Sequence, residues 1–449
     1  MASPPNVEIV FKPKPDQPPP VATVGVLGWL HQNLFYSIVS SIVTVVGLYL
    51  LYELGAFLWD WGVTNAIWEA ENRRVCLDHN VATETDGACW AGVKLWFKGF
   101  MYGRYPLDER WRVNLGFILL VLWMAPMWLP RVSGKVQIGI TAVVAYPFLA
   151  AYLFAGGERG WFMQIAVLLA CAIFVIIWLH VIFCVTSGRS LSEHLVERTG
   201  LTQKHESTHK YPVLGLVVLF MIIGYFLFGD WEAVRVGTNQ WGGLFLTLVI
   251  AGVAIVFALP GGIILALARR STMPIIRVFA IAFIELFRSV PLITVLFMAV
   301  TMFPLFLPEG FELNKLVQAM VGVCLFAAAY MAEVIRGGLQ AIPKGQYEAA
   351  QAMGLTYWKM MNLIILPQAL KMMIPNIVGN FIGLLKDTTL VSIIGLYDML
   401  RMLNSAGQNP QWIGMHKETL FFGAVVYFIL CFAMSQYSQR LEKKLATGH

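Results

Sequence analysis

Long apolar stretches without a charged residue constrain this chain more than any other feature of its sequence. A helix needs roughly 20 predominantly apolar residues to cross the hydrocarbon core of a bilayer. Stretches that reach or approach this length lie at residues 32–52, 113–130, 136–157, 160–179, 211–229, 236–268, 289–308, 316–332, 372–385 and 419–439. They predict an all-α polytopic membrane protein with about ten transmembrane helices.

The composition supports this prediction and excludes several classes of protein. Of the 449 residues, 58% are hydrophobic and 13% are charged, whereas about 25% of the residues of an average soluble protein are charged. A soluble enzyme, a disordered chain and a small disulfide-rich scaffold are therefore excluded. The net charge of +6 is ordinary for a membrane protein with basic loops and does not indicate a nucleic-acid partner.

The distribution of basic residues predicts the orientation of the chain in the membrane. When the N-terminus is placed in the cytoplasm, most of the 32 Lys and Arg residues fall in cytoplasmic segments and few fall in the short outer loops. Cytoplasmic loops of membrane proteins carry an excess of Lys and Arg. We therefore expect both termini to be cytoplasmic.

The apolar stretches divide the chain into three parts. Residues 1–33 contain a run of prolines, which favours an extended cytoplasmic tether, and no cleavable signal pattern precedes the first helix. Residues 34–235 are predicted to form an N-terminal extension of about five transmembrane helices, with a long outer loop at 58–112. Residues 236–449 form the C-terminal part, whose cytoplasmic loop at 343–367 carries the most informative motif.

Two of the six cysteines lie outside the apolar stretches. Cys76 and Cys89 both fall in the loop at 58–112, which the predicted orientation places on the oxidising side of the membrane. Disulfides form and persist in such compartments. The pair is therefore a candidate disulfide, and the alternative is two free thiols in a poorly ordered segment.

The same loop contains aromatic residues interleaved with basic ones. This pattern suits a helix at the lipid interface, and it could also contact an outer partner, although aromatic belts are general in membrane proteins. The residues concerned are Trp90, Trp96, Phe97, Phe100, Tyr102 and Tyr105, together with Lys94, Lys98 and Arg104.

The loop at 187–210 contains three histidines, His194, His205 and His209. Their spacing matches no compact metal site, so a solvated loop is the favoured interpretation. We expect the chain to bind no metal.

The segment at 343–367 has the signals of two short helices joined at a glycine. The first helix is expected to begin near Pro343 and to end just before Gly354. Thr356 is a suitable N-cap for the second helix, which is expected to stop at Leu366-Pro367. An amphipathic face of this second helix is predicted from Trp358, Met361, Ile364 and Ile365. Together the two helices would form a compact cytoplasmic knob that a partner could grip.

This segment resembles the EAA loop of the permease subunits of type I ATP-binding cassette (ABC) importers. The matching residues are Glu348-Ala349-Ala350, Gly354, Ile364 and Leu366-Pro367, in the spacing of the motif. In that family the loop holds a coupling helix that docks in a cleft of a cytoplasmic ATPase. The resemblance implies that Glu348, Ala349, Ala350 and Gly354 couple this chain to such an ATPase. An ordinary loop of good helix formers is the alternative.

Three further strings resemble the polar amino acid branch of this family, the histidine, glutamine and arginine permeases. They are the residues at 285–292, 328–338 and 386–392, and the resemblance spans about 240–440. The N-terminal half and the segment at 87–112 resemble the M subunit of the general L-amino acid permease of Gram-negative bacteria. The implied function is an inner-membrane pore that imports L-amino acids by alternating access.

The sequence has no nucleotide-binding motif of the form Gly-x-x-x-x-Gly-Lys-Ser/Thr. We therefore expect this chain not to be an enzyme and to bind no cofactor, and energy has to come from another subunit. The resemblance implies an ATPase dimer that uses ATP and Mg, a periplasmic amino acid-binding protein and a second homologous permease subunit. A heterodimer of permeases is expected by resemblance, and the sequence leaves a homodimer open.

Charged and hydroxyl residues within an apolar stretch identify a candidate substrate pathway. Lys386, Asp387, Thr388 and Thr389 interrupt such a stretch near the C-terminus. Ionisable residues at membrane depth face the interior of a helix bundle and are functional by default. These four could contact the carboxylate or ammonium group of a substrate, or form a structural pair that locks two helices.

Other charged pairs and one proline have a structural interpretation. Glu333 and Arg336 are three residues apart on one predicted helix, and Glu285 and Arg288 repeat that spacing. Pro260, followed by two glycines, is expected to bend the long helix that ends at Arg269.

Two other functional classes remain open at this point. A secondary transporter or channel of ten helices would use no ATPase, and its transport would be insensitive to loss of ATP. A membrane scaffold would have no cavity, and substitution of Glu348 would leave uptake unchanged.

Overall fold

A computed structural model describes residues 25–157, 160–187, 210–228, 232–308, 310 and 313–446. Helices account for nearly all regular structure in these residues, and the all-α polytopic class predicted from the apolar stretches is confirmed. The chain forms two compact units, Met1–Ala91 and Gly92–His449.

The first unit contains one membrane-length helix. α2 (Ile38–Trp59) begins after Ser37, whose hydroxyl oxygen accepts a hydrogen bond from the Ser40 amide, which is a favourable N-cap. No residue of α2 is buried, as expected for an apolar helix surrounded by lipid. The other helices of this unit are α1 (Gly25–Asn33) and α3 (Arg73–Ala82). The prolines of the predicted tether at 1–33 lie outside the described residues.

A disulfide closes the segment that follows α2. Cys76 of α3 is bonded to Cys89, with their Cα atoms 5.9 Å apart, and both residues are buried. The Ile67 amide donates to the Ala88 carbonyl at 2.8 Å, so the segment is also closed by backbone hydrogen bonds. The two cysteines outside the apolar stretches are therefore paired with each other.

The second unit begins with helices that precede the C-terminal part. α4 (Trp90–Tyr102) is short, and α7 packs against both α5 and α8, while α8 also packs against α10. The bounds of these helices are α5 (Arg110–Met124), α6 (Lys135–Val144), α7 (Tyr146–Ala155), α8 (Trp161–Ser187) and α10 (Lys210–Phe228). The three histidines of the predicted solvated loop lie between α8 and α10, outside the described residues.

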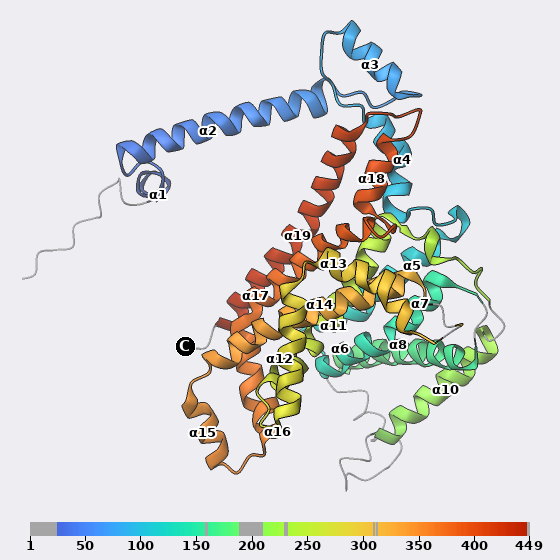
Figure 1. Cartoon of the computed structure of the whole chain (residues 1–449), viewed down its shortest axis with the longest axis vertical. Helices are drawn as coiled ribbons and strands as arrows, with labels where there is room; N and C mark the ends of the chain where they lie inside the picture. Colours follow the sequence, from blue (N-terminus) through green and yellow to red (C-terminus); the bar gives the residue numbers. More distant parts are fainter. Residues whose placement is uncertain are drawn as a thin grey trace, which may run out of the picture. The chain divides into compact units, whose positions relative to one another are not determined.

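The C-terminal helices surround α14 (Lys315–Ala341), which packs against α11, α12, α13 and α17 (Figure 1). Its apolar residues are among the most deeply buried in the chain, including Ala319, Ala329 and Met331. The other elements are α11 (Gly243–Arg269), α12 (Pro274–Ser289), α13 (Leu292–Phe297), α15 (Lys344–Ala352), α16 (Tyr357–Met360), α17 (Leu366–Asp387), β1 (Tyr397–Asp398), α18 (Met399–Gly407) and α19 (His416–Ala446).

Eight helices of the described residues are long and apolar enough to cross a membrane, and two further candidates bring the total close to the predicted ten. One candidate is the shorter apolar helix at Leu214–Phe226. The other is a bent pair, Pro274–Ser289 with Leu292–Phe306, whose halves meet at 107°. The stretch predicted at 289–308 is the second half of this pair, and its helix begins at Leu292 because Val290 is extended, as the residue before a proline disfavours the helical conformation.

The aromatic segment around α4 packs against other helices instead of lying wholly at the lipid interface. Phe100 is fully buried, and its ring lies 5.7 Å from the ring of Phe422 on α19. Tyr105 is also buried and donates a hydrogen bond to the Phe154 carbonyl at 2.9 Å. The prediction of an interfacial helix is corrected for these two residues, because the sequence pattern could not distinguish burial against protein from burial against lipid.

Glycines allow α11 and α14 to approach closely. α11 runs unbroken through Pro260, and a Cβ atom at Gly262 would lie 2.7 Å from the Cβ of Met331 on α14. A Cβ at Gly261 would lie 2.9 Å from that of Ala328. The two glycines after Pro260 thus remove side chains where the helices touch.

Candidate coupling surface and translocation site

The segment at 343–367 contains the two short helices that its sequence predicts. α15 begins directly after Pro343, and Met353 is its C-cap. Gly354 follows with φ of +71°, a left-handed conformation that favours glycine. The Leu355 amide donates to the Ala350 carbonyl at 3.2 Å, which closes the turn between the helices. Thr356 occupies the predicted N-cap position of α16, although its side chain makes no capping hydrogen bond.

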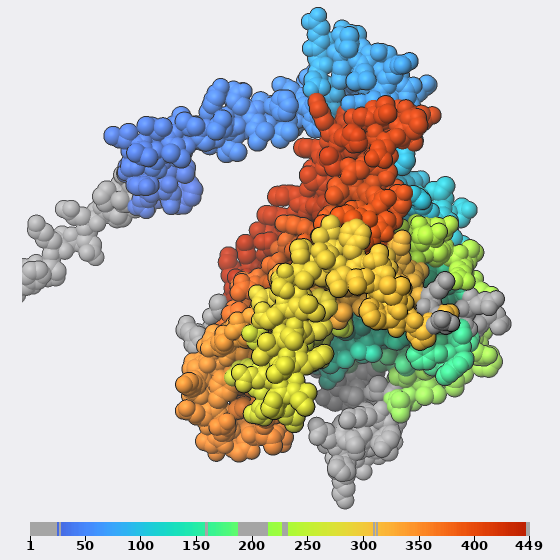
Figure 2. Space-filling model, viewed as in Figure 1, coloured from blue at the N-terminus to red at the C-terminus, as the bar shows by residue number. Residues whose placement is uncertain are grey.

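The turn between α15 and α16 presents apolar side chains to the outside. The exposed fractions of Met353 and Trp358 are 80% and 64%, and Tyr357 is also exposed. Glu348 and Ala349 are exposed beside them, whereas Ala350 is buried and packs α15 onto the core. This tip, defined here as residues 348–358, lies at the end of the core opposite α18 (Figure 1). Figure 2 shows its orange surface protruding at the lower left.

The second helix of the loop does not stop at Leu366-Pro367, so that prediction is wrong. α16 continues through a π-helical turn, Met361–Ile365, directly into α17. Pro367 therefore lies within a continuous helical run, directly after the π-helical turn, where a proline removes one backbone hydrogen bond of the helix. The residues of the predicted amphipathic face do not share one environment, because Met361 and Ile365 are buried while Trp358 is exposed.

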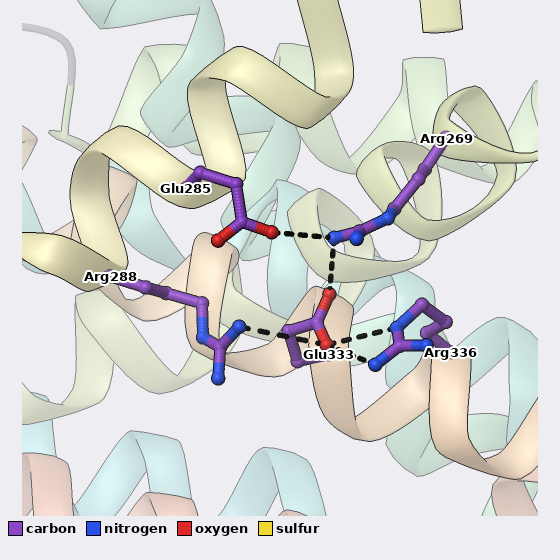
Figure 3. Close-up of polar contacts among 5 residues, drawn as sticks. All are labelled: Arg269, Glu285, Arg288, Glu333 and Arg336. Atoms are coloured by element: carbon purple, nitrogen blue, oxygen red, sulfur yellow. Dashed lines mark hydrogen bonds and ion pairs between the residues drawn. The ribbon is translucent and has the colours of Figure 1, made fainter.

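A cluster of five charged residues joins three helices at the end of the core that carries α15 (Figure 3). Arg269 at the end of α11 contacts Glu333 of α14 at 2.6 Å and Glu285 of α12 at 3.2 Å. The second carboxylate oxygen of Glu333 contacts Arg336 at 2.6 Å and Arg288 of α12 at 3.6 Å. We call these five residues the ion cluster.

The ion cluster modifies the two pairs expected from residue spacing. Glu333 and Arg336 pair along one helix as predicted. Glu285 and Arg288 instead pair with residues of other helices, Arg269 and Glu333 respectively. Spacing of three residues on one helix identified the charged residues but could not predict these partners.

The four residues of the predicted substrate pathway point into different parts of the core. Asp387 lines a cavity of about 590 Å³ between α14 and α17, together with Tyr330, Asn376 and Asn380. Lys386 and Thr389 line a separate, smaller groove beside α18 and α19. The side chain of Thr388 is buried and donates to the Leu385 carbonyl at 2.7 Å. The structure therefore brings Asp387, but not Lys386, to the cavity between α14 and α17.

Sequence reasoning missed the two asparagines of this cavity. Asn376 and Asn380 are four residues apart within the uncharged stretch at 372–385, so they share one face of α17. That spacing of polar side chains at membrane depth was the available signal. Among the described residues, no group of three or more His, Cys, Asp or Glu side chains is placed to hold a metal ion.

Comparison with known proteins identifies the family. Residues 258–447 match the family described as "Binding-protein-dependent transport system inner membrane component". The chain is 40% identical over 420 residues to the inner membrane amino-acid ABC transporter permease protein YhdY of Escherichia coli (strain K12), covering 94% of this chain and 93% of that protein. The chain belongs to the family of amino-acid ABC transporter permeases.

A second relative agrees with this assignment. The permease is 37% identical over 449 residues to the glutamate/glutamine/aspartate/asparagine transport system permease protein BztC of Rhodobacter capsulatus, covering 96% of each chain. It also aligns with a solved structure titled "Crystal structure of an amino acid ABC transporter with histidines", at 28% identity and a TM-score of 0.40, over 45% of this chain and 92% of that one.

The family assignment confirms the principal functional prediction. The protein is a membrane-embedded permease subunit of an amino-acid ABC importer, as the EAA loop and the polar amino acid motifs predicted. The matched region at 258–447 includes the tip, the ion cluster and the cavity between α14 and α17. All three features therefore belong to the part of the permease that the family model describes.

Proposed function

We propose that this permease forms one half of a pore that moves L-amino acids from the periplasm to the cytoplasm, driven by a separate ATPase that grips α15. The observation that carries this proposal is the exposed apolar tip at residues 348–358. Large apolar side chains exposed next to a charged residue are typical of a protein-binding surface. The match of Glu348, Ala349, Ala350 and Gly354 to the EAA motif supports an ATPase as the partner.

The proposed assembly contains four kinds of component besides lipid. They are this permease, a second homologous permease that completes a heterodimeric pore, a cytoplasmic ABC ATPase dimer and a periplasmic amino acid-binding protein. ATP and Mg bind to the ATPase, because this chain has no Gly-x-x-x-x-Gly-Lys-Ser/Thr motif. The bacterial inner membrane is the proposed location, with both termini in the cytoplasm, as the distribution of Lys and Arg supports.

The proposed mechanism is alternating access. Closure of the nucleotide-bound ATPase dimer draws the coupling helices together, and the permease pair changes from an inward-facing to an outward-facing state. The binding protein then releases its amino acid into the pore, and ATP hydrolysis resets the assembly. A ligand can drive such a change only by binding one state better than the other, which the nucleotide does through the ATPase.

The cavity between α14 and α17 is the proposed substrate pathway on this side of the pore. An amino acid carries both a carboxylate and an ammonium group, so its recognition requires donors and acceptors together. Asp387 can accept a hydrogen bond from the ammonium group, and the amides of Asn376 and Asn380 can donate to the carboxylate. Lys386 near the end of α17, and Thr388 and Thr389 directly after it, would act outside this cavity.

Substitution of Gly354 tests the coupling role directly. The Gly354→Asp variant is expected to insert into the membrane but to lose ATP-driven uptake, because a charged side chain at φ of +71° spoils both the turn and the fit to the ATPase. Gly414→Asp is a matched control, since Gly414 also has a positive φ of +84° and no atom within 4 Å of an added Cβ.

Two measurements decide the outcome. Affinity purification of the tagged permease should recover an ATPase and a second permease with wild type and Gly414→Asp, and less ATPase with Gly354→Asp. Uptake should follow the same order. Recovery of wild-type protein without any ATPase, or uptake by Gly354→Asp at the wild-type rate, would contradict the proposal. Uptake that persists after ATP depletion would instead favour a secondary transporter.

A further inference from the structure

Tyr347 connects α15 to two other helices of the core. Its hydroxyl group accepts a hydrogen bond from Nη1 of Arg270 at 3.0 Å and donates one to the Leu339 carbonyl at 3.1 Å. Arg270 is the C-cap of α11, and Leu339 lies in the last turn of α14. One phenol group therefore bridges α15, α11 and α14.

The connection continues from Arg270 into the ion cluster. Arg269, the preceding residue, contacts Glu333 of α14 and Glu285 of α12 through one nitrogen atom, Nη1. Glu333 then contacts Arg336 and Arg288. Through these contacts the polar network extends from α15 to the ends of α11, α12 and α14, as the side chains in Figure 3 show for the cluster itself.

The charges of this network oppose the movement of any one of its helices away from the others. The ion cluster contains three arginines and two glutamates, and the side chain of Glu333 is only 13% exposed. If a helix moved so that Glu333 lost contact with one arginine, a partly buried charge would be left without its partner. This costs free energy because the charge is not fully hydrated there. The ends of α11, α12 and α14 are therefore held together as one body.

α17 is attached to α15 in a different way. It follows α15 along the chain through α16 and the π-helical turn, and Nε2 of Gln368 donates a long, exposed hydrogen bond of 3.3 Å to Gln346. Every residue of the ion cluster comes from α11, α12 or α14. The cavity of about 590 Å³ lies where α14 of this body faces α17.

We propose that Tyr347 is a positioning residue that makes α15 move together with α11, α12 and α14 as one rigid body relative to α17. This inference rests on the proposed role of α15 as the coupling helix. Force applied to α15 passes through the Tyr347 hydroxyl and the ion cluster to α14. The cavity between α14 and α17 then widens or narrows as the ATPase opens and closes.

The Tyr347→Phe variant tests this role, because it removes the hydroxyl group and keeps the ring. We expect the complex to assemble and to hydrolyse ATP, while the number of amino acids transported per ATP falls about fivefold, the change expected from loss of roughly one net hydrogen bond. Tyr437→Phe on α19 is a matched control, since this side chain is exposed and lies outside the tip, the ion cluster and the cavity. It should transport like wild type.

A double-variant cycle identifies the partner of the hydroxyl group. Arg270→Gln should lower the transport per ATP, and combination with Tyr347→Phe should add little, because residues that act through one contact are not additive. Arg270→Lys keeps a cationic donor and should restore part of the coupling. Additive losses would show that the two residues act independently and would overturn the proposed connection.

A distance measurement separates positioning from a merely structural role. Spin labels at Gln351 of α15 and Gly337 of α14, introduced after replacing the four unpaired cysteines, should keep one separation with and without trapped nucleotide in the wild-type complex. In Tyr347→Phe the separation should broaden or change between the two states. A separation that changes in wild type, or normal transport per ATP by Tyr347→Phe, would overturn the inference.

These experiments distinguish a failure of the inference about Tyr347 from a failure of the proposed function. If wild-type protein recovers no ATPase, the coupling role of α15 is itself wrong. If the ATPase is recovered with wild type and with Tyr347→Phe, and both transport equally per ATP, only the role of Tyr347 is wrong. Force would then reach the pore through α16 and α17 alone.

Discussion

At the scale of single residues, Glu333 makes the most contacts within the ion cluster. It lies between three arginines and is largely shielded from water, whereas the side chain of Glu285 is 56% exposed and forms one ion pair within the cluster, with Arg269. Partly buried ion pairs contribute mainly through the penalty that follows when one partner is lost, and exposed pairs contribute little.

We therefore expect Glu333→Gln to lower the free energy of unfolding by about 2 kcal/mol and Glu285→Gln to lower it by less than about 1 kcal/mol. Thermal unfolding of the detergent-solubilised permease, followed by tryptophan fluorescence, measures the difference between the two. Equal melting temperatures for these variants would contradict the shielded position of Glu333.

The residues of the loop at 343–367 differ in how well the sequence predicts them. Gly354 was found because a helix that ends at a glycine requires a left-handed residue, and this requirement is local. Tyr347 was not singled out, because its partners lie 8 and 77 residues away in the sequence. The hydrogen-bond partners of a hydroxyl group cannot be read from the sequence when they are brought to it only by the tertiary fold.

At the scale of helices, the length of uncharged stretches predicted the elements that lipid surrounds. α12 was missed because it contains Arg277, Glu285 and Arg288, which interrupt its apolar sequence. Two of these charges form the ion pairs that hold α12 to α11 and α14. Two of the three charges that interrupt the apolar sequence of α12 are thus paired in the fold.

α4 provides a test of helix packing against the core. Phe100 is fully buried beside Phe422, whereas Phe97 on the same helix is 45% exposed and also contacts Phe422. We expect Phe100→Ala to lower the free energy of unfolding by about 3 kcal/mol, because it leaves a cavity, and Phe97→Ala to lower it by less than about 1 kcal/mol.

Thermal melting of the two alanine variants in the same detergent checks this expectation. A helix that lay at the lipid interface, as its sequence pattern predicted, would show small and similar effects at both positions. A large loss confined to Phe100→Ala would support the packing of α4 against α19.

At the scale of the whole molecule, composition and apolar length predicted the membrane class and the approximate number of spans, because both depend on the solvent and not on tertiary contacts. The cavity between α14 and α17 could not be predicted in this way. Lys386 and Asp387 are adjacent in sequence, yet they line different hollows because successive residues of a helix point about 100° apart.

The orientation of the chain is a prediction that the whole molecule has to satisfy. The span Tyr357–Ser392 separates the tip from the loop between α18 and α19, so these two segments must lie on opposite sides of the membrane. The distribution of Lys and Arg places the tip inside. Single cysteines at Gln351 of α15 and at the exposed Gln411 would report the two sides.

In intact spheroplasts, a membrane-impermeant maleimide should label Gln411→Cys and leave Gln351→Cys unmodified. In inverted vesicles the order should reverse, because the cytoplasmic face is then outside. Labelling of Gln351→Cys in spheroplasts would place the tip in the periplasm, where no ATPase can bind it, and would remove the basis for coupling. Equal labelling of both positions on one side would instead show that Tyr357–Ser392 does not span the membrane.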